Sequence, residues 1–329
     1  MRKLYILGMI LGMYATFSAC NDEWKDELYT QMLSFKAPLG DNGLSEIYVR
    51  YQPDGTGIYQ LPVIVSGSKS NSRNIDAKIA VDEDTLRILN QEKFPVGRQD
   101  LWYVPLAEQH YSFESNICHI PAGENIQLYP IHFNFNGLEL DEKYVLPLTI
   151  EEDPSYVQNK YKGVNLFNDY SGTYNTTLMN IYIEGTTTDP AKVDTRLARV
   201  VDENTIFFYA GSTWVEDENR SRYKVFVEFE EGTEDEEGTI KGKLRLYGDE
   251  GEPGINIRPL GECKYEKRII QHETIKYMER HLTTLELSYK YTDVTSNPDY
   301  PITYEVKGSM TMERQINPLI PDEDQAIEW

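Results

Sequence analysis

The chain has 329 residues, 40% of them hydrophobic, so it is long enough for about two domains and apolar enough to give each a core. Its 54 acidic residues outnumber the 32 basic ones, and the formal net charge at pH 7 is −22. So acidic a surface repels phosphate backbones and anionic lipid headgroups, which argues against nucleic acid as a partner and against docking on a charged membrane.

The first predicted element is a secretory signal peptide over residues 1–19. Arg2 and Lys3 form a basic start, and an apolar run from Leu4 to Met13 follows. This run is too short to span a bilayer, which takes about 20 apolar residues. The segment Phe17-Ser18-Ala19-Cys20 resembles the bacterial lipobox, in which the cysteine is acylated and becomes the new N-terminus. The alternative is a soluble exported protein with a chance cysteine at this place.

An acidic cluster, Asn21-Asp22-Glu23, comes directly after the cysteine. It resembles the signal by which Bacteroidota lipoproteins reach the outer face of the outer membrane. We therefore expect Cys20 to be the lipidation site, with membrane contact through the lipid anchor only and the protein facing the cell exterior. Residues 20–30 are short, polar and acidic, and we expect them to act as a tether.

Residues 31–152 predict a β-sandwich. Short runs of alternating, β-branched or aromatic residues are separated by turns rich in Gly, Pro and Asn, which is typical of sandwich strands. Asn74–Val81 shows the pattern well, with Ile75, Ala77, Ile79 and Val81 on one face. The predicted strands are Gln31–Ala37, Glu46–Tyr51, Ile58–Val65, Asn74–Val81, Ser115–Ile120, Gln127–Phe135 and Lys143–Ile150, with a short helix at Leu86–Leu89.

Residues 153–169 are polar without a clear period and predict a linker. Residues 170–316 predict a second β domain, an antiparallel meander that forms either a barrel or a sandwich. Lys267–Arg280 permits a helix or a strand, and the tail 317–329 is expected to be frayed. The predicted strands are Gly172–Glu184, Arg196–Tyr209, Tyr223–Glu230, Thr239–Tyr247, Ile255–Tyr265, Leu282–Thr292 and Ile302–Met312.

Nothing in the chain has the pattern of a catalytic or metal site. Cys118 and Cys263 lie far apart in different predicted domains, so we expect two buried thiols and no disulfide. The five histidines form no pair with zinc-ligand spacing. A glycosidase needs two positioned carboxylates, but with 54 acids in the chain adjacent ones carry no signal. The acidic run Glu230–Gly238 predicts a solvated hairpin turn. We expect no enzyme, no metal and no cofactor.

The aromatic residues are the better candidates for a site. Tyrosine is abundant, 24 against 11 Phe, and it favours strands and surfaces that need an apolar face with a polar tip. Trp214 lies in a polar stretch between two predicted strands, where core packing explains a tryptophan poorly. Trp102 and Tyr103, with Tyr111 close behind, lie in a second loop-like segment, and covering one end of the sandwich core is their alternative role. These four are the predicted ligand-binding residues.

Several segments of the first domain together carry a resemblance to a known family. They are Tyr59–Gly67, Asn74–Asp82 with Leu86 and Asn90, Ile120–Gly123 and Tyr144–Ile150. In this order, behind a lipobox, they resemble the uncharacterised Ig-like domain of Bacteroidota surface lipoproteins, which also precedes some family 18 endo-β-N-acetylglucosaminidases. The match covers roughly residues 30–152. The second half, which opens with Asp169–Tyr174, is similar to the β-rich C-terminal domain often paired with that module.

The resemblance implies an all-β fold, an Ig-like β-sandwich followed by an antiparallel meander that is a lipocalin-like barrel or a sandwich. About 170 β-rich residues cannot hold a (β/α)₈ barrel of about 250, so we expect no attached hydrolase. The implied role is a non-catalytic surface lipoprotein of a glycan-utilisation locus that captures oligosaccharide or polysaccharide for an outer-membrane transporter complex. One alternative is a structural lipoprotein that docks on a transporter or adhesin-like assembly without binding sugar. Another is a barrel that holds an apolar ligand in its interior.

Overall fold

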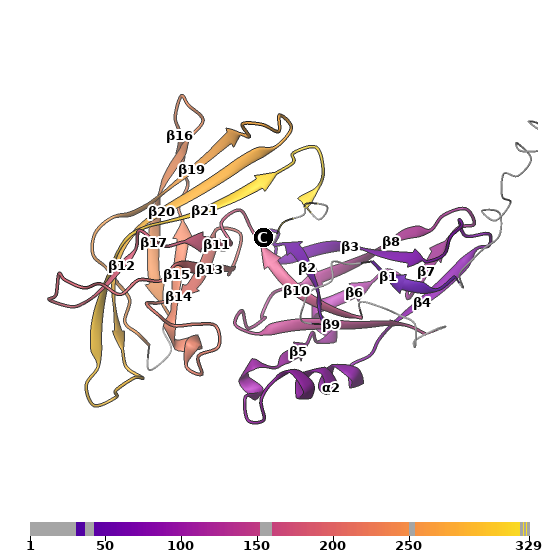
Figure 1. Ribbon diagram of the computed structural model, residues 1–329, viewed down its shortest axis with the longest axis horizontal. Helices are drawn as coiled ribbons and strands as arrows, with labels where there is room; N and C mark the ends of the chain where they lie inside the picture. Colours follow the sequence, from indigo (N-terminus) through magenta and orange to yellow (C-terminus); the bar gives the residue numbers. More distant parts are fainter. Residues whose placement is uncertain are drawn as a thin grey trace, which may run out of the picture.

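The computed structural model describes residues 31–36, 43–151, 160–249, 254–322, 325 and 327, and these form a sandwich and a barrel (Figure 1). The predicted signal peptide, its lipidation residue Cys20 and the tether up to residue 30 lie outside these residues. Within the described ranges, no helix is long and apolar enough to cross a membrane.

The first domain is a sandwich of two sheets, as predicted. One sheet has the order β1 (Leu33–Phe35), β3 (Thr56–Val65), β8 (Ile126–Asn134), β6 (Tyr111–Phe113). The other has the order β2 (Ser45–Arg50), β10 (Tyr161–Phe167), β9 (Lys143–Ile150), β4 (Ile75–Val81), β7 (Ile117–Ile120), with β5 (Tyr103–Pro105) beside β9. Alternate residues such as Leu61, Val63, Ile131 and Leu148 fill the space between the sheets and are fully buried.

Strand β9 is buried on both faces over most of its length. Its inner face meets the sandwich core, while Val145 on its outer face packs in a cluster with Leu86 of helix α2 (Asp84–Lys93). Asn90 of this helix exchanges two hydrogen bonds of 2.9 Å with the backbone of Tyr103 in β5. The helix therefore fixes the loop that follows it, which includes the short helices η2 (Gln99–Leu101) and η3 (Glu108–His110).

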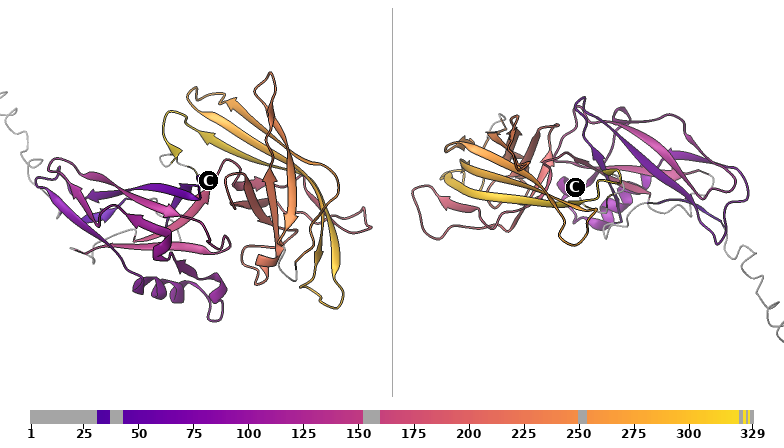
Figure 2. Two further views of the ribbon diagram at one scale, coloured as in Figure 1. Left: turned by 180° about the vertical axis from the view of Figure 1, so that it is seen from behind. Right: turned by 90° about the horizontal axis from the view of Figure 1, so that it is seen from above.

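The second domain is an antiparallel barrel. Its closed ring runs β11 (Gly172–Asn175), β13 (Thr195–Val200), β14 (Thr205–Tyr209), β15 (Lys224–Phe229), β17 (Ile240–Gly248), β19 (Cys263–Gln271), β20 (Glu279–Asp293), β21 (Ile302–Ile316). The ring closes because β21 pairs with β20 along its whole length and with β11 at Thr311 (Figure 2). The short strands β12 (Asn180–Ile183), β16 (Thr233–Glu234) and β18 (Arg258–Pro259) pair outside this ring, and η4 (Arg220–Tyr223) precedes β15.

The barrel interior is filled by side chains. Phe208, Leu285, Tyr289 and Met310 are buried among other large apolar residues, and the cavity that remains beside them measures only about 20 Å³. One water needs about 10–15 Å³, so this cavity has room for little more than one water molecule and none for an apolar ligand. The filled interior removes the lipocalin-like binding alternative.

The expected linker is partly wrong. Residues 161–167 form β10, which pairs in parallel with β2 and antiparallel with β9 inside the sandwich sheet. Lys162 and Gly163 interrupt the apolar pattern of this strand, and its partner β2 lies more than a hundred residues earlier in the chain. The strand is therefore held by long-range pairing that its local sequence does not reveal.

The structure corrects or resolves four expectations for the second half. The predicted strand 172–184 is two strands, β11 and β12, and 196–209 is the hairpin β13–β14, whose turn occupies 201–204. Lys267–Arg280 is a hairpin between β19 and β20, not a helix. The expected frayed tail turns back on the molecule: Gln325 accepts a hydrogen bond of 3.0 Å from the backbone of Asn317, and Asp322 pairs with Arg50 of the sandwich.

Candidate functional site

The two domains are joined by a buried ion pair. The carboxylate of Asp141, in the loop before β9, lies 3.1 Å from the ammonium group of Lys224 in β15, and both side chains are about nine-tenths buried. The Tyr209 hydroxyl donates a 3.3 Å hydrogen bond to the same carboxylate. The Asp141 loop is therefore anchored in the barrel wall.

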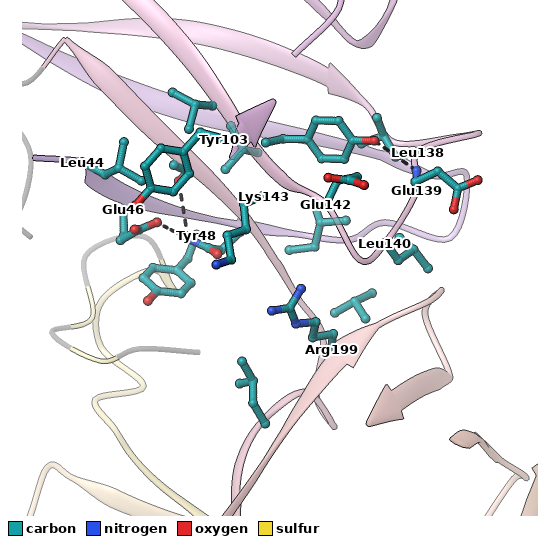
Figure 3. A pocket seen from close by; sticks show the side chains of 18 of the residues that line it. Leu44, Glu46, Tyr48, Tyr103, Leu138, Glu139, Leu140, Glu142, Lys143 and Arg199 are labelled. Atoms are coloured by element: carbon teal, nitrogen blue, oxygen red, sulfur yellow. Dashed lines mark hydrogen bonds between the residues drawn. The ribbon is translucent and has the colours of Figure 1, made fainter. Parts of the chain in front are cut away.

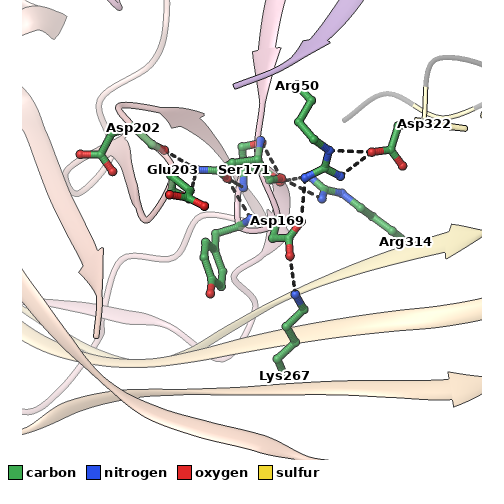
Figure 4. A network of polar contacts seen from close by, with 10 residues as sticks. Arg50, Asp169, Ser171, Asp202, Glu203, Lys267, Arg314 and Asp322 are labelled. Carbon is green, nitrogen blue, oxygen red and sulfur yellow. Dashed lines mark hydrogen bonds and ion pairs between the residues drawn. The ribbon is translucent and has the colours of Figure 1, made fainter. Parts of the chain in front are cut away.

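A second polar network joins the sandwich, the start of the barrel and the tail (Figure 4). Arg50 Nη1 lies 2.9 Å from the Asp169 carboxylate, and Arg50 Nε donates to Asp322 at 2.6 Å. Lys267 of β19 contacts Asp169 at 2.7 Å. Burial alone would raise the pKa of Asp169, but Lys267 and Arg50 outweigh it and lower that pKa to about 2. Arg314 donates to the backbone carbonyls of Asn168 and Ser171 beneath this network.

A third contact links the two loops that carry the predicted tryptophans. Arg98 of the first loop pairs with Asp100 and also donates to the Glu216 carbonyl in the second. Arg220 at the end of the second loop donates to the Asp100 carbonyl at 2.8 Å. The sequence suggested these loops as two separate candidates, and the structure brings them together at the domain boundary.

These contacts surround a pocket between the domains, with a volume of about 390 Å³ (Figure 3). This lies in the range of about 300–1,000 Å³ that small-molecule sites occupy. Its walls come from β2, β9 and β10 of the sandwich and from β11 and β13 of the barrel. The lining side chains that can recognise a ligand are Glu46, Tyr48, Lys143, Asn165, Arg199 and Tyr144.

Polar groups of both signs face this pocket. Glu46 Oε2 accepts a 2.6 Å hydrogen bond from the Asn165 amide, which holds both side chains in place. Lys143 of β9 and Arg199 of β13 approach the pocket from opposite domains (Figure 3). Burial, together with the positive charges of Arg199 and Arg220, lowers the pKa of Lys143.

A second hollow of about 260 Å³ continues the surface along the domain boundary. It shares Tyr48 with the first pocket and is also lined by Arg50, Gln52 and Phe167. The Arg50 guanidinium stacks on the Phe167 ring, 4.7 Å from its centroid. Tyr48 therefore forms part of the wall of both hollows.

Trp214 has the geometry of a fixed, exposed aromatic platform. Its side chain is 54% exposed, while the guanidinium of buried Arg196 lies 5.6 Å from the centre of the ring. Its backbone N–H donates to the Asp217 carboxylate at 2.7 Å, and Arg196 donates to the Thr213 carbonyl at 3.0 Å. The Arg196 guanidinium therefore packs against the Trp214 ring, and the rest of the ring surface is exposed to solvent.

The other three predicted residues are placed differently. Tyr103 is buried, with its ring edge-on to Phe94 and its hydroxyl bonded to Lys93, and burial raises its pKa to about 12. It reaches the first pocket only as part of the wall. Tyr111 packs on Phe113 beside the sandwich core and does not line either hollow. Trp102 is half-buried at the end of η2, close to Asp100. Tyr103 and Tyr111 therefore fill the structural role that the sequence offered as their alternative.

The pocket residues Glu46, Lys143, Asn165 and Arg199 were not predicted from the sequence. None belongs to a local motif, and Asn165 falls in the expected linker. Only the packing of β13 against the sandwich brings Arg199 to Lys143. Lys143 stands at the start of a predicted strand, but that position alone does not indicate a binding residue.

Cys118 and Cys263 are buried and unbonded to each other, as predicted, and burial raises the pKa of both thiols, for Cys118 to about 11. In the part of the chain that the structure describes, no three His, Cys, Asp or Glu side chains converge to hold a metal ion.

Comparisons with known proteins find similar proteins from Bacteroides. The model of a family described as a domain of unknown function, DUF4973, matches residues 24–154, and a C-terminal domain model matches residues 159–311. No curated protein matches the chain. A crystal structure of an auxiliary nutrient binding protein from Bacteroides thetaiotaomicron is 29% identical, with a TM-score of 0.75, and the match covers 92% of this chain and 100% of that one.

A protein of unknown function from Bacteroides ovatus is 28% identical, with a TM-score of 0.76, and the match covers 93% of this chain and 98% of that one. A multidomain protein including DUF1735, also from Bacteroides ovatus, is 39% identical with a TM-score of 0.79, and the match covers 91% of this chain and all of the other. Because the likeness extends over the whole of that relative, this chain belongs to the same family as the Bacteroides ovatus multidomain protein, and its own residues 24–154 match the DUF4973 model.

Proposed function

We propose that the protein is a non-catalytic glycan-binding lipoprotein, anchored through Cys20 on the outer face of the outer membrane. In this role it captures oligosaccharide for an outer-membrane importer. The lipobox and acidic cluster of the sequence support the location. A relative that is called an auxiliary nutrient binding protein supports the capture of a nutrient.

The observation that carries the proposal is the exposed ring of Trp214, held in place by Arg196 and Asp217. Sugar rings present C–H groups on one face, and these stack on aromatic rings, whose binding costs little entropy when the ring is already fixed. Carboxylates, amides and guanidinium groups accept and donate hydrogen bonds to the sugar hydroxyls at the ring edge. The first pocket, between the domains, supplies such groups.

The pocket is also preformed. Three polar contacts, through Asp141, Asp169 and Asp100, tie the sandwich to the barrel around it. A site between two locked domains needs little ordering on binding, which favours affinity for a weakly interacting ligand such as a neutral sugar.

Binding measurements on the full-length chain in detergent test the proposal. Affinity gels and isothermal titration against a panel of host and plant glycans are expected to find at least one ligand. Trp214→Ala is expected to weaken its binding by about 10-fold or more, because the stacking surface is lost.

Tyr277→Ala is the matched control, since Tyr277 is an equally exposed ring, 57%, on the distant β19–β20 hairpin. It is expected to bind like the native chain. Absence of binding across the panel would remove the proposed function, and unchanged binding by Trp214→Ala would remove the site assignment.

A structural or docking role has its own observation. On the outer face of the sandwich, Leu128 lies opposite Pro62 and Ile126 opposite Ile64, and Ile58 lies further along the same face of β3, beyond Gln60. Ile58, Ile126 and Leu128 are each about half exposed. Co-purification with an outer-membrane protein that is lost in Leu128→Asp, without any glycan binding, would favour this role over the first.

A further inference from the structure

Lys143 and Arg199 are two cations of the first pocket that lack a carboxylate partner. Among the described residues, neither forms an ion pair: Lys143 Nζ lies 5.9 Å from the centre of the Phe94 ring, and Arg199 Nη1 donates to the Asp141 carbonyl at 3.3 Å. Their neighbours at the same boundary differ. Arg98 and Arg220 pair with Asp100, and Lys224 pairs with Asp141.

The chain has 54 acids against 32 bases. Acidic partners are plentiful, yet two half-buried cations face the same hollow from opposite domains. Like charges that approach in a partly desolvated site repel each other. Burial lowers the pKa of Lys143 most, and the positive charges of Arg199 and Arg220 lower it further. An anion bound between the two cations would relieve this repulsion.

We propose that the pocket between the domains binds a sugar residue that carries one anionic group, a carboxylate or a sulfate ester, held by Lys143 and Arg199. The inference rests on the proposed glycan-binding function and names the class of glycan. Arg presents a planar fork that suits the oxygens of either group, and Lys adds a compact charge from the opposite wall.

The remaining lining argues against a multiply charged ligand. Glu46, Glu139 and Glu142 also line the pocket, and Glu46 is held by Asn165. These carboxylates accept hydrogen bonds from sugar hydroxyls but repel further anions. The pattern of two cations with flanking carboxylates therefore fits a polyhydroxylated ring with a single charge better than a polyphosphate.

Titration of the full-length chain in detergent with matched probes tests this inference. Glucuronate and galacturonate are compared with glucose and galactose, and glucose 6-sulfate provides the sulfate arm. At least one charged probe is expected to bind about 10-fold or more tightly than its neutral counterpart, because hydrogen bonds to charged groups are stronger than those between neutral groups. Its affinity is expected to fall as the salt concentration rises. The arm that binds identifies the anionic group.

Lys143→Gln and Arg199→Gln are each expected to abolish this preference. Lys264→Gln, which removes an exposed lysine that pairs with Glu286 on the barrel, is expected to retain it. Equal binding of charged and neutral probes, no binding of any charged probe, or a preference retained in both pocket variants would overturn the inference.

The two proposals fail in different ways. Neutral sugars that bind through Trp214 without any charge preference would preserve the proposed function and remove the anion site. A charged probe whose binding is lost in Lys143→Gln but unchanged in Trp214→Ala would preserve the anion site and remove Trp214 from the binding surface.

Discussion

Asp141 of the sandwich and Lys224 of the barrel form an ion pair of 3.1 Å, with both side chains about nine-tenths buried. The Tyr209 hydroxyl and the Arg199 guanidinium bond to the same residue, at its carboxylate and its carbonyl. One loop of the sandwich thus carries a contact that fixes the barrel and shapes the pocket. The orientation of the domains and the geometry of the site depend on the same few atoms.

Asp141→Asn is expected to destabilise the protein strongly. Removing one member of a buried ion pair leaves the other charge uncompensated, which costs about 3–5 kcal/mol. Chemical denaturation is expected to show a lower midpoint. Glu286→Gln, which breaks an exposed pair with Lys264, is the matched control and is expected to cost less than about 1 kcal/mol. Equal losses in the two variants would show that the interface pair contributes no more than a surface pair.

Stability is expected to fall in acid through Asp169. Its carboxyl has a pKa of about 2 in the folded protein, against an ordinary 3.8, because Lys267 and Arg50 outweigh the effect of burial. The folded state therefore binds fewer protons than the unfolded state between these values. The stabilisation is complete above about pH 4 and is lost as the pH falls towards 2.

Thermal unfolding from pH 5 to pH 2 measures this dependence. Asp169→Asn is expected to start less stable at pH 5 and to lose less on acidification than the native chain. Because the Asp169 side chain is about half exposed, the difference is expected to shrink in high salt. An identical acid loss in the variant would assign the effect to other carboxyls.

Gly211 at the base of the Trp214 loop is expected to resist substitution. Its φ is +59°, and a Cβ there would overlap the hydroxyl of Tyr291, which is buried and cannot move aside. Gly185 also has a positive φ, +82°, but a Cβ there meets nothing. Gly185→Ala is expected to cost only the backbone strain, about 1–2 kcal/mol. Gly211→Ala is expected to add an overpacking cost of about 1–3 kcal/mol and to displace Trp214.

Unfolding midpoints of the two alanine variants separate these contributions. If both variants lose the same stability, the contact with Tyr291 is not a constraint. If Gly211→Ala loses stability but binds glycan like the native chain, then the position of Trp214 does not depend on this turn.

The strands were largely predictable because most have one buried face and a short turn at each end. Alternation placed β4 closely, and sequential strands joined by short turns indicated an antiparallel meander. β10 was missed because its lysine is fully buried and its pairing with β2 is parallel and distant in sequence. Closure by the pairing of β20 with β21 is also a long-range event, and the sequence left barrel and sandwich open.

The candidate site was predictable only where one residue carried the signal. A tryptophan in a polar loop is conspicuous, and Trp214 is exposed as that reasoning required. Lys143 and Arg199 form a candidate site only because the two domains pack together, so no local stretch of sequence could predict that site. The burial of Tyr103 was not predictable, because a loop-like neighbourhood does not reveal that helix α2 packs against this residue.

Phe208→Ala is expected to convert the filled barrel into one with a cavity. Phe208 is 2% exposed and borders the small space of about 20 Å³ beside Tyr289 and Met310. Loss of the ring is expected to cost about 3–5 kcal/mol, because its neighbours relax only partly into the space. The enlarged apolar cavity is expected to bind benzene, which raises the melting temperature of the variant but not of the native chain. Leu197→Ala, at a half-exposed position on neighbouring β13, is the control and is expected to stay within about 1 kcal/mol of the native chain and to ignore benzene. Stabilisation of the native chain by benzene would instead reveal an interior that accepts apolar ligands and would restore the barrel as a binding compartment.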